Sequence, residues 1–293
     1  MEDKKEKEYD GTMRLSPTSI LTFRRCPREF YYHYVLKLPT PSNIHLIKGS
    51  VVHTVLENFF KYGFKDNLED SMEDLFVKEW ETYKEELASL NLPAEELERQ
   101  EQDCRNMLSM FLRTFRIKMD GLKWSGKAEN DRHAYYLLKP KFREKFMEDK
   151  DLNVCGFVDR IHNDFSGITT IGDYKTGSRY GIGIKDEYEI QCGIYALLYE
   201  LNTGQRADYT SIIFIRFGEE VRTRVTPDQI KTALDVIKET HEKIKSDKMC
   251  DYPTNQSKFC KWCSFFEKCS GLEEHKDEVR QKKAIEGLKE LKK

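Results

Sequence analysis

The sequence predicts an α/β fold in which helices pack around a mixed sheet, and three observations support this prediction. Up to residue 119, apolar residues recur at the spacing of helices. From residue 134 onward, the pattern changes to short runs rich in β-forming residues. A further helix from about residue 186 to 202, stopped by Gly204, interrupts these runs. A mostly helical segment therefore precedes the sheet.

The N-terminal part is predicted to be helical because Ser16 and two prolines favour helix starts, and the apolar residues that follow share one face. The predicted helices cover Pro17 to about Arg24, a further stretch from Pro27, then Gly49 to Phe60, 69–90 and 95–119. The segment 64–133 contains the last two of these helices. It is predicted to be a mostly helical insertion.

Runs rich in β-branched and aromatic residues predict the sheet. Strands are expected at 134–147, 152–162, 168–175, 210–217 and 221–225, and a helix from Pro227 to about residue 246 follows them. The two ends of the chain, 1–12 and 272–293, are highly charged. They are predicted to be a mobile arm and a charged tail.

The bulk composition limits the classes of function. The formal net charge of −2 gives no global basic field. This counts against a protein that coats DNA, but less against an enzyme that binds a short segment of DNA. No apolar run approaches the roughly 18 residues of a membrane span, and the charged N-terminus is no signal peptide. An intracellular location without membrane contact is expected. Thiols stay reduced there, so the 8 cysteines suggest metal or cluster ligation.

The most informative local feature is the predicted pairing of two acids across a β-hairpin. Asp164–Phe165–Ser166–Gly167 is typical of a turn between two strands. A turn centred near Ser166 places Asp159 opposite Asp173, with side chains roughly 5 Å apart on one face. Period-2 alternation puts Lys175 on the same face. Two carboxylates and an ammonium group this close form a divalent-metal site suited to phosphodiester hydrolysis.

The helix predicted over 186–202 adds two polar residues to this group. Gln191 and Tyr195 are separated by four positions and share one helix face, while apolar neighbours form the buried stripe. Each residue of the group, taken singly, is also typical of a turn, a cap or a helix boundary. Their combination favours a catalytic group over these structural alternatives.

Together these motifs resemble the PD-(D/E)XK nuclease superfamily, in particular its RecB-like branch. The second acid is Asp where Glu is commoner, a variant that the family pattern allows. The resemblance implies a restriction-endonuclease-like fold in a single domain over 13–271, with catalytic roles for Asp159, Asp173, Lys175, Gln191 and Tyr195. The matching motifs are Gly156–Phe157–Val158–Asp159, Asp173–Tyr174–Lys175–Thr176–Gly177 and the Q-x-x-x-Y element Gln191–Cys192–Gly193–Ile194–Tyr195.

The resemblance also implies a set of metal ligands. His53 stands in a matching G-x-x-x-H context on an early helix, although a lone His on an apolar helix is otherwise most often a satisfied core residue. It is implied as a ligand together with Asp159, Asp173 and the backbone carbonyl of Tyr174. Glu144 is a weaker candidate because charged strand residues usually face water. Carboxylate oxygens suit Mg²⁺ or Mn²⁺, and an imidazole favours Mn²⁺.

A second group of candidate ligands lies near the C-terminal end. Cys260, Cys263 and Cys269 form a C-x₂-C-x₅-C motif in the segment 250–271. Cys26 resembles the amino-terminal cysteine of iron–sulfur RecB-like nucleases, in which one early cysteine and such a late motif hold a [4Fe–4S] cluster. Four thiolates also suit structural zinc, but zinc ribbons usually pair two C-x₂-C knuckles and only one is present. The resemblance implies a structural [4Fe–4S] cluster.

The function implied by the resemblance is that of a metal-dependent DNA nuclease, most simply an exonuclease on single-stranded DNA or DNA ends. Its partners would be a CRISPR integrase complex in spacer acquisition, or recombination and repair proteins. A non-catalytic DNA-end-binding scaffold and an RNA nuclease are the alternatives. The intact Asp159, Asp173 and Lys175 argue against a scaffold. RNA cleavage stays an open alternative, because no motif that reads a 2′-hydroxyl distinguishes RNA from DNA here. The insertion 64–133 either arches over the active site or packs as an annex.

Overall fold

The computed structural model describes residues 12–177 and 184–269. Within them the chain forms two compact units. The core unit comprises residues 12–21 and Ser42–Lys245, and the terminal unit comprises Thr22–Pro41 and residues 246–269. The predicted charged tail, and all but Thr12 of the predicted arm, lie outside the described residues.

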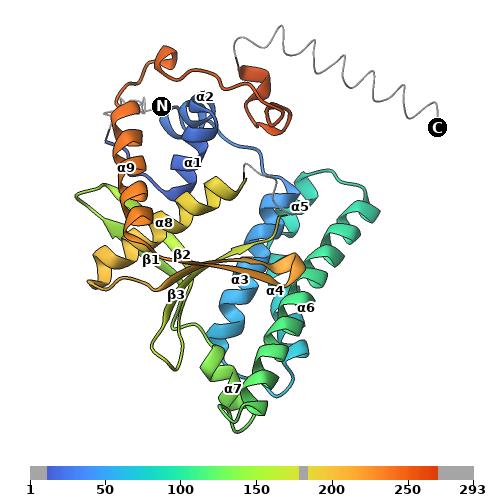
Figure 1. Cartoon of the computed structure of the whole chain (residues 1–293). Coiled ribbons are helices and arrows are strands. Elements are labelled where there is room, and N and C mark those ends of the chain that lie inside the picture. Colours follow the sequence, from blue (N-terminus) through green and yellow to red (C-terminus); the bar gives the residue numbers. More distant parts are fainter. Residues whose placement is uncertain (1–11, 178–183, 270–293) are drawn as a thin grey trace, which may run out of the picture. The chain divides into compact units, whose positions relative to one another are not determined.

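The core unit contains a five-stranded mixed sheet of order β1-β2-β3-β4-β5 (Figure 1). The first three strands form an antiparallel meander, β4 runs parallel to β3 after the crossover helix α8 (Ile184–Thr203), and β5 pairs antiparallel with β4. This is the predicted mixed sheet, and it has the restriction-endonuclease-like form. The strands are β1 (Phe142–Asp149), β2 (Val154–Asn163), β3 (Thr169–Lys175), β4 (Tyr209–Phe214) and β5 (Glu219–Arg224).

Helices cover both faces of the sheet, and the alternation along β4 shows which helices lie on which face (Figure 1). Ile212 and Phe214 pack with Cys192 of α8, against which α9 (Pro227–Lys243) packs in turn. Ile213 points the other way, into the large apolar cluster of the helices from the N-terminal part. These helices are α3 (Ile44–Tyr62), α4 (Leu68–Thr82), α5 (Lys84–Ser89), α6 (Ala94–Trp124) and α7 (Asp131–Leu138).

Side-chain caps explain where several of these helices begin. The side chains of Asn43, Asn67 and Asn130 accept backbone N–H groups of α3, α4 and α7, and Thr226 does the same for α9. The segment 64–133 contains α4, α5, α6 and the start of α7. Its apolar residues share one core with α3. None of the described helices combines the length and apolarity that a membrane span requires.

The strand predicted over 134–147 is wrong in its first half. Residues Asp131–Leu138 form α7, and β1 begins only at Phe142. Asn130 caps the helix by accepting the N–H of His133, and the buried Tyr135 donates its hydroxyl to the carbonyl of Phe59 at 2.7 Å. The aromatic residues here are typical of a strand, but a local cap and burial against α3 stabilise a helix instead.

The terminal unit joins segments that are far apart in the sequence. It contains the end of α1 (Pro17–Arg25), α2 (Pro27–Phe30) and a π-helical turn (Tyr31–Val35), packed with the C-terminal segment. Tyr252 is fully buried and stacks on Phe30, with ring centroids 6.2 Å apart. The Arg28 guanidinium donates to the Tyr252 carbonyl at 2.8 Å. The two ends of the described chain are thus held together by one buried arginine and an aromatic cluster.

Candidate active site

Strand register aligns three carboxylates in a row across β1, β2 and β3. The β2–β3 pairing ends at Arg160↔Gly172. The next residue pair in the same register is Asp159 and Asp173, which confirms the alignment that the sequence of the hairpin predicted. In the β1–β2 ladder, Arg143↔Arg160 and Lys145↔Val158 flank a position at which Glu144 stands opposite Asp159. The acids of three neighbouring strands therefore meet at one level of the sheet.

The backbone departs from regular strand geometry at this level. Glu144 has a φ of 42°, which is uncommon for a residue with a side chain. On β2, Val158 and Asp159 are both buried, so the inside–outside alternation shifts by one residue there. Because β2 and β3 no longer pair beyond Arg160, Asp159 Oδ2 accepts the backbone N–H of Tyr174 at 2.5 Å. Local strain of this kind is typical of functional sites.

His53 of α3 completes a group that could hold a metal ion. One ligand atom each of His53, Glu144 and Asp159 lies within 4.8 Å of the others. Burial by itself lowers the pKa of His53, but hydrogen bonds with Asp159 and Glu144 raise it to about 10. The carboxylates of Asp159 and Glu144 thus favour a positive charge between them. One imidazole nitrogen and two carboxylates form a donor set that fits Mg²⁺ or Mn²⁺.

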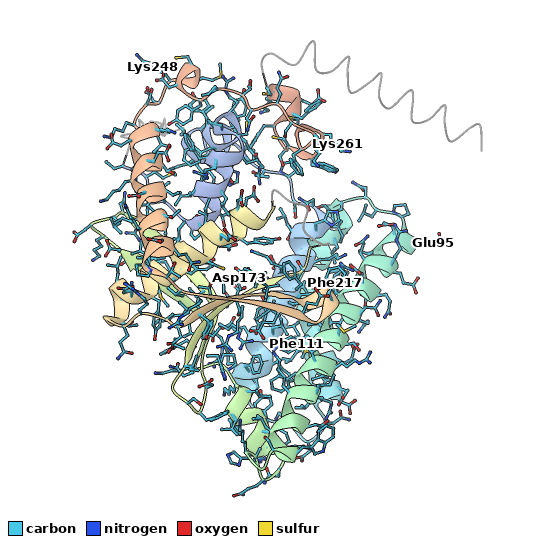
Figure 2. The ribbon with its side chains drawn as sticks, in the orientation of Figure 1. Glu95, Phe111, Asp173, Phe217, Lys248 and Lys261 are labelled. Atoms are coloured by element: carbon cyan, nitrogen blue, oxygen red, sulfur yellow. The ribbon has the colours of Figure 1, made fainter. Side chains whose placement is uncertain are left out.

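A hydrogen-bonded network adjoins this group. The Lys175 ammonium forms an ion pair with Asp173 Oδ2 at 2.7 Å and donates to Gln191 Oε1 at 2.8 Å. The Gln191 amide donates to Asp173 Oδ1 at 3.0 Å and to the Tyr195 hydroxyl at 3.2 Å. Asp173 is buried in the interior of the core unit (Figure 2). Gln191 therefore connects the acid, the lysine and the tyrosine.

Burial and neighbouring charge shift the proton affinities of this network. Burial raises the pKa of Asp173 to about 6, because Lys175 offsets the loss of solvation only in part and Asp159 adds to it. Burial disfavours the charged form of Lys175, but Asp173 outweighs this effect and its pKa is raised. Burial also raises the pKa of Tyr195. At neutral pH, Lys175 is consequently a cation and Tyr195 a neutral hydroxyl.

The structure brings the predicted residues together in an arrangement that differs in one respect from the prediction. The compact ligand group contains Glu144 with His53 and Asp159, whereas Asp173 is engaged by Lys175. The backbone of Tyr174 lies beside Asp159 through its N–H. Sequence reasoning ranked Glu144 low, and the signal that could have raised it was its register opposite Asp159 in the β1–β2 pair.

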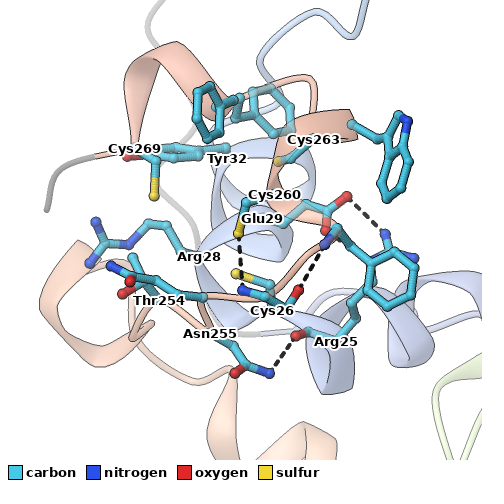
Figure 3. Close-up of a pocket in the computed structure, with 16 residues that line it drawn as sticks. Arg25, Cys26, Arg28, Glu29, Tyr32, Thr254, Asn255, Cys260, Cys263 and Cys269 are labelled. Carbon is cyan, nitrogen blue, oxygen red and sulfur yellow. Dashed lines mark hydrogen bonds and ion pairs between the residues drawn. The ribbon is translucent and has the colours of Figure 1, made fainter. Parts of the chain in front are cut away.

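The four cysteines of the predicted cluster meet in the terminal unit. Cys26, Cys260, Cys263 and Cys269 line one cavity of about 260 Å³ (Figure 3). Cys250 is exposed and does not line it. Burial first, then several nearby groups that include Cys26 and Cys260, raise the pKa of the Cys263 thiol to about 11. Four half-buried thiols that line one cavity could together hold a metal group.

The spacing of these sulfur atoms bears on the group that they could hold. Four-coordinate zinc with Zn–S bonds of about 2.3 Å requires sulfur atoms about 3.8 Å apart. Among the described residues, no three cysteine sulfurs lie within 4.8 Å of one another. A cluster of several iron atoms holds its thiolates farther apart than a single ion does. The described cysteine sulfurs therefore do not have the mutual spacing of a four-coordinate zinc site.

The mixed sheet, the row of acids where the strand geometry is irregular and the half-buried Lys175 define a nuclease of the restriction-endonuclease-like class. Residues 14–270 match the sequence model of the PD-(D/E)XK nuclease superfamily, and the chain belongs to this superfamily. A crystal structure described as a "putative exonuclease" from Eubacterium rectale is similar, with a TM-score of 0.50 and 16% identity over 90% of this chain and 92% of that one. At this identity the likeness shows the fold. No curated protein matches the sequence.

Proposed function

We propose that this protein is a metal-dependent deoxyribonuclease that acts on single-stranded DNA or DNA ends, most simply as an exonuclease. The observation that carries the proposal is the His53–Glu144–Asp159 group beside the Asp173–Lys175 pair. The RecB-like motifs support a place in CRISPR adaptation or in recombination and repair, with an integrase complex or recombination proteins as partners. The net charge of −2 is compatible with an enzyme that binds a short segment of DNA and does not coat it.

His53, Glu144 and Asp159 would hold a Mg²⁺ or Mn²⁺ ion, with Asp173 next to them in the row of acids. When bound, this ion acidifies the attacking water and neutralises charge on the scissile phosphate. The raised pKa of Lys175 keeps its ammonium protonated. Lys175 therefore acts as a fixed cation that stabilises charge developing on the phosphate, and not as a general base.

The direct test is a cleavage assay with end-labelled single-stranded DNA, duplex DNA and RNA, each with Mn²⁺ or with EDTA. Cleavage of single-stranded DNA or of duplex ends that requires Mn²⁺ is expected. Products that shorten one nucleotide at a time from an end would support an exonuclease. Cleavage of RNA alone, or binding of DNA ends with no cleavage of any substrate, would contradict the proposal.

Gln191 is proposed to position Lys175 and Asp173, and its replacement by leucine tests this role. Gln191→Leu removes the acceptor for Lys175 and the donor to Asp173. We expect kcat to fall about tenfold or more while KM for DNA changes little, because the lost contacts orient charge in the transition state.

Gln102→Leu is the matched control, since the side chain of Gln102 lies exposed on α6 and donates to Asn106 at 3.0 Å. Its kcat should equal that of the wild type. A rise in KM with unchanged kcat in Gln191→Leu would instead mean that Gln191 contributes uniform substrate binding, and would refute its role in positioning.

We further propose that Cys26, Cys260, Cys263 and Cys269 hold a [4Fe–4S] cluster, as in the iron–sulfur branch that the motifs resemble. Support comes from the shared cavity, and among the described residues no three cysteine sulfurs lie within 4.8 Å of one another. A cluster bound there would cross-link the two chain segments of the terminal unit. Its role would be structural.

A further inference from the structure

A second cavity, of about 190 Å³, lies in the core unit between the sheet and α6. Phe111, which lines it, marks its place in Figure 2. The cavity is much larger than the roughly 10–15 Å³ that one ordered water molecule needs. Its apolar walls belong to the core of the N-terminal helices. Five charged side chains line it as well, namely Lys118, Arg160, Asp164, Glu220 and Arg222.

Strand register brings two arginines to the same face of the sheet. The successive partners across β2, β3, β4 and β5 are Arg160, Gly172, Ser211 and Arg222. Residues directly opposite each other in a sheet share one face. A Cβ on Gly172 would lie 2.7 Å from Cγ of Arg160, so the arginine side chain crosses β3 where the glycine leaves room. Because Asp173 follows Gly172 in the strand, this row faces away from the catalytic network.

The two carboxylates of the cavity are already engaged, but the two arginines are not paired with them. Glu220 forms an ion pair with Lys118 at 2.8 Å. The Asp164 carboxylate accepts two backbone N–H groups of its own turn. Among the described residues, neither Arg160 nor Arg222 forms an ion pair. The Nε of Arg160 is buried and has no hydrogen-bond partner in this part of the chain.

An unpartnered guanidinium beside a cavity calls for an acceptor. A buried N–H group without a hydrogen bond costs free energy, and such groups in native proteins mark the places of ligands, ions or ordered water. Burial raises the pKa of Glu220, but Arg160 and Lys118 outweigh burial and lower it to about 2. Burial and Arg160 lower the pKa of His162, whose Nδ1 is likewise buried without a partner. The lining thus carries three permanent cations against two carboxylates, an excess of positive charge.

We propose that this cavity binds a small phosphate monoester, whose phosphate group accepts hydrogen bonds from Arg160 and Arg222. At neutral pH such a phosphate carries a charge of about −1.5 to −2, which matches two guanidinium groups, whereas a carboxylate would neutralise only one. The aromatic walls suit a flat or apolar body attached to the phosphate, and a bare phosphate ion would leave them uncovered. These walls are Phe60, Phe111 and Phe115. The site goes beyond the proposed nuclease function and does not depend on it.

The test is isothermal titration calorimetry of the full chain with three probes: thymidine 5′-monophosphate, thymidine and inorganic phosphate. EDTA is present, so that no divalent ion in the candidate active site can hold the phosphate. We expect the monophosphate to bind at one site. Thymidine lacks the charge and inorganic phosphate lacks the apolar body, so each should bind about tenfold more weakly or worse.

Arg160→Met should bind the monophosphate about tenfold more weakly or worse, the scale of one hydrogen bond to a charged group. Methionine removes the charge and the N–H donors but keeps an unbranched chain over Gly172. Arg222→Met, at an exposed position, should show a similar loss and serves as the second variant if Arg160→Met does not fold. Arg113→Gln is the matched control, because Arg113 lies exposed on α6 and does not line the cavity. Its affinity should equal that of the wild type.

Several outcomes would overturn the proposal. Absence of monophosphate binding by the wild type, or equal affinity for thymidine and the monophosphate, would exclude a phosphate site. Unchanged affinity in both folded arginine variants would exclude this cavity. An equal loss in Asp173→Asn would place the ligand in the candidate active site on the other face of the sheet. The cleavage assay in Mn²⁺ tests the nuclease function separately, so the failure of one proposal is distinguishable from the failure of the other.

Discussion

Replacement of Asp173 by asparagine is expected to reduce metal-dependent cleavage at least about a hundredfold, the scale on which one preorganised electrostatic group contributes to catalysis. Asp173 lies in the row of acids with Asp159, holds the Lys175 ammonium at 2.7 Å and accepts from Gln191 at 3.0 Å. Asparagine keeps the shape of the side chain but removes the charge that a divalent ion and Lys175 both use. The measurement is the initial rate on end-labelled single-stranded DNA in Mn²⁺.

The folded state should survive this change, which separates a catalytic effect from a structural one. Lys175 keeps Gln191 Oε1 as a hydrogen-bond acceptor, and the volume of the buried side chain is conserved. The melting temperature is therefore expected to stay within a few degrees of the wild type. Asp235→Asn, at an exposed position of α9, should be indistinguishable from wild type in both measurements. Full nuclease activity in Asp173→Asn would falsify the assignment of the site.

Replacement of Cys26 by alanine is expected to remove the iron–sulfur cluster and to destabilise the terminal unit. This unit is small, and the other contacts between its two chain segments are hydrogen bonds, such as those of Arg28 and Tyr32, and aromatic packing around Tyr252. A bound cluster that links Cys26 with the C-x₂-C-x₅-C motif would add most of its stability, since ligand binding to the native state alone stabilises it. Wild-type protein purified without oxygen should be brown and contain iron.

The comparison uses iron content, visible absorption and thermal unfolding. Cys26→Ala should lose colour and iron, and its first unfolding transition should move down by several degrees. Cys250→Ala is the matched control, because Cys250 lies in the same segment, is exposed and does not line the cavity. It should retain full iron and stability. A colourless wild-type protein with stoichiometric zinc and no iron would reject the cluster and identify a zinc site.

Local sequence was sufficient to predict the central hairpin because its turn is stabilised by its own residues. The Asp164 carboxylate accepts the N–H groups of Ser166 and Ile168 at 2.8 and 3.0 Å, and Gly167 adopts a φ of 80°. A turn of known length determines the register of the strands beside it. The alignment of Asp159 with Asp173 followed from that register, and Gln191 and Tyr195 followed from helical periodicity.

Other features depend on contacts between segments that are distant in the chain. The aromatic sequence around Tyr135 favours a strand, but the Asn130 cap and the hydrogen bond to Phe59 make it a helix. The pairing of Cys26 with the late cysteines was inferred only by resemblance. The structure brings them to one cavity through packing that no local pattern encodes.

The sequence by itself thus determined the family, the mixed sheet and the two acids and lysine of the hairpin, because turn chemistry and side-chain periodicity act over short distances. Only the tertiary structure decided that Glu144 joins His53 and Asp159. The physical reason is that these positions depend on the β1–β2 register and on a left-handed backbone at Glu144. The packing of the whole sheet stabilises both features.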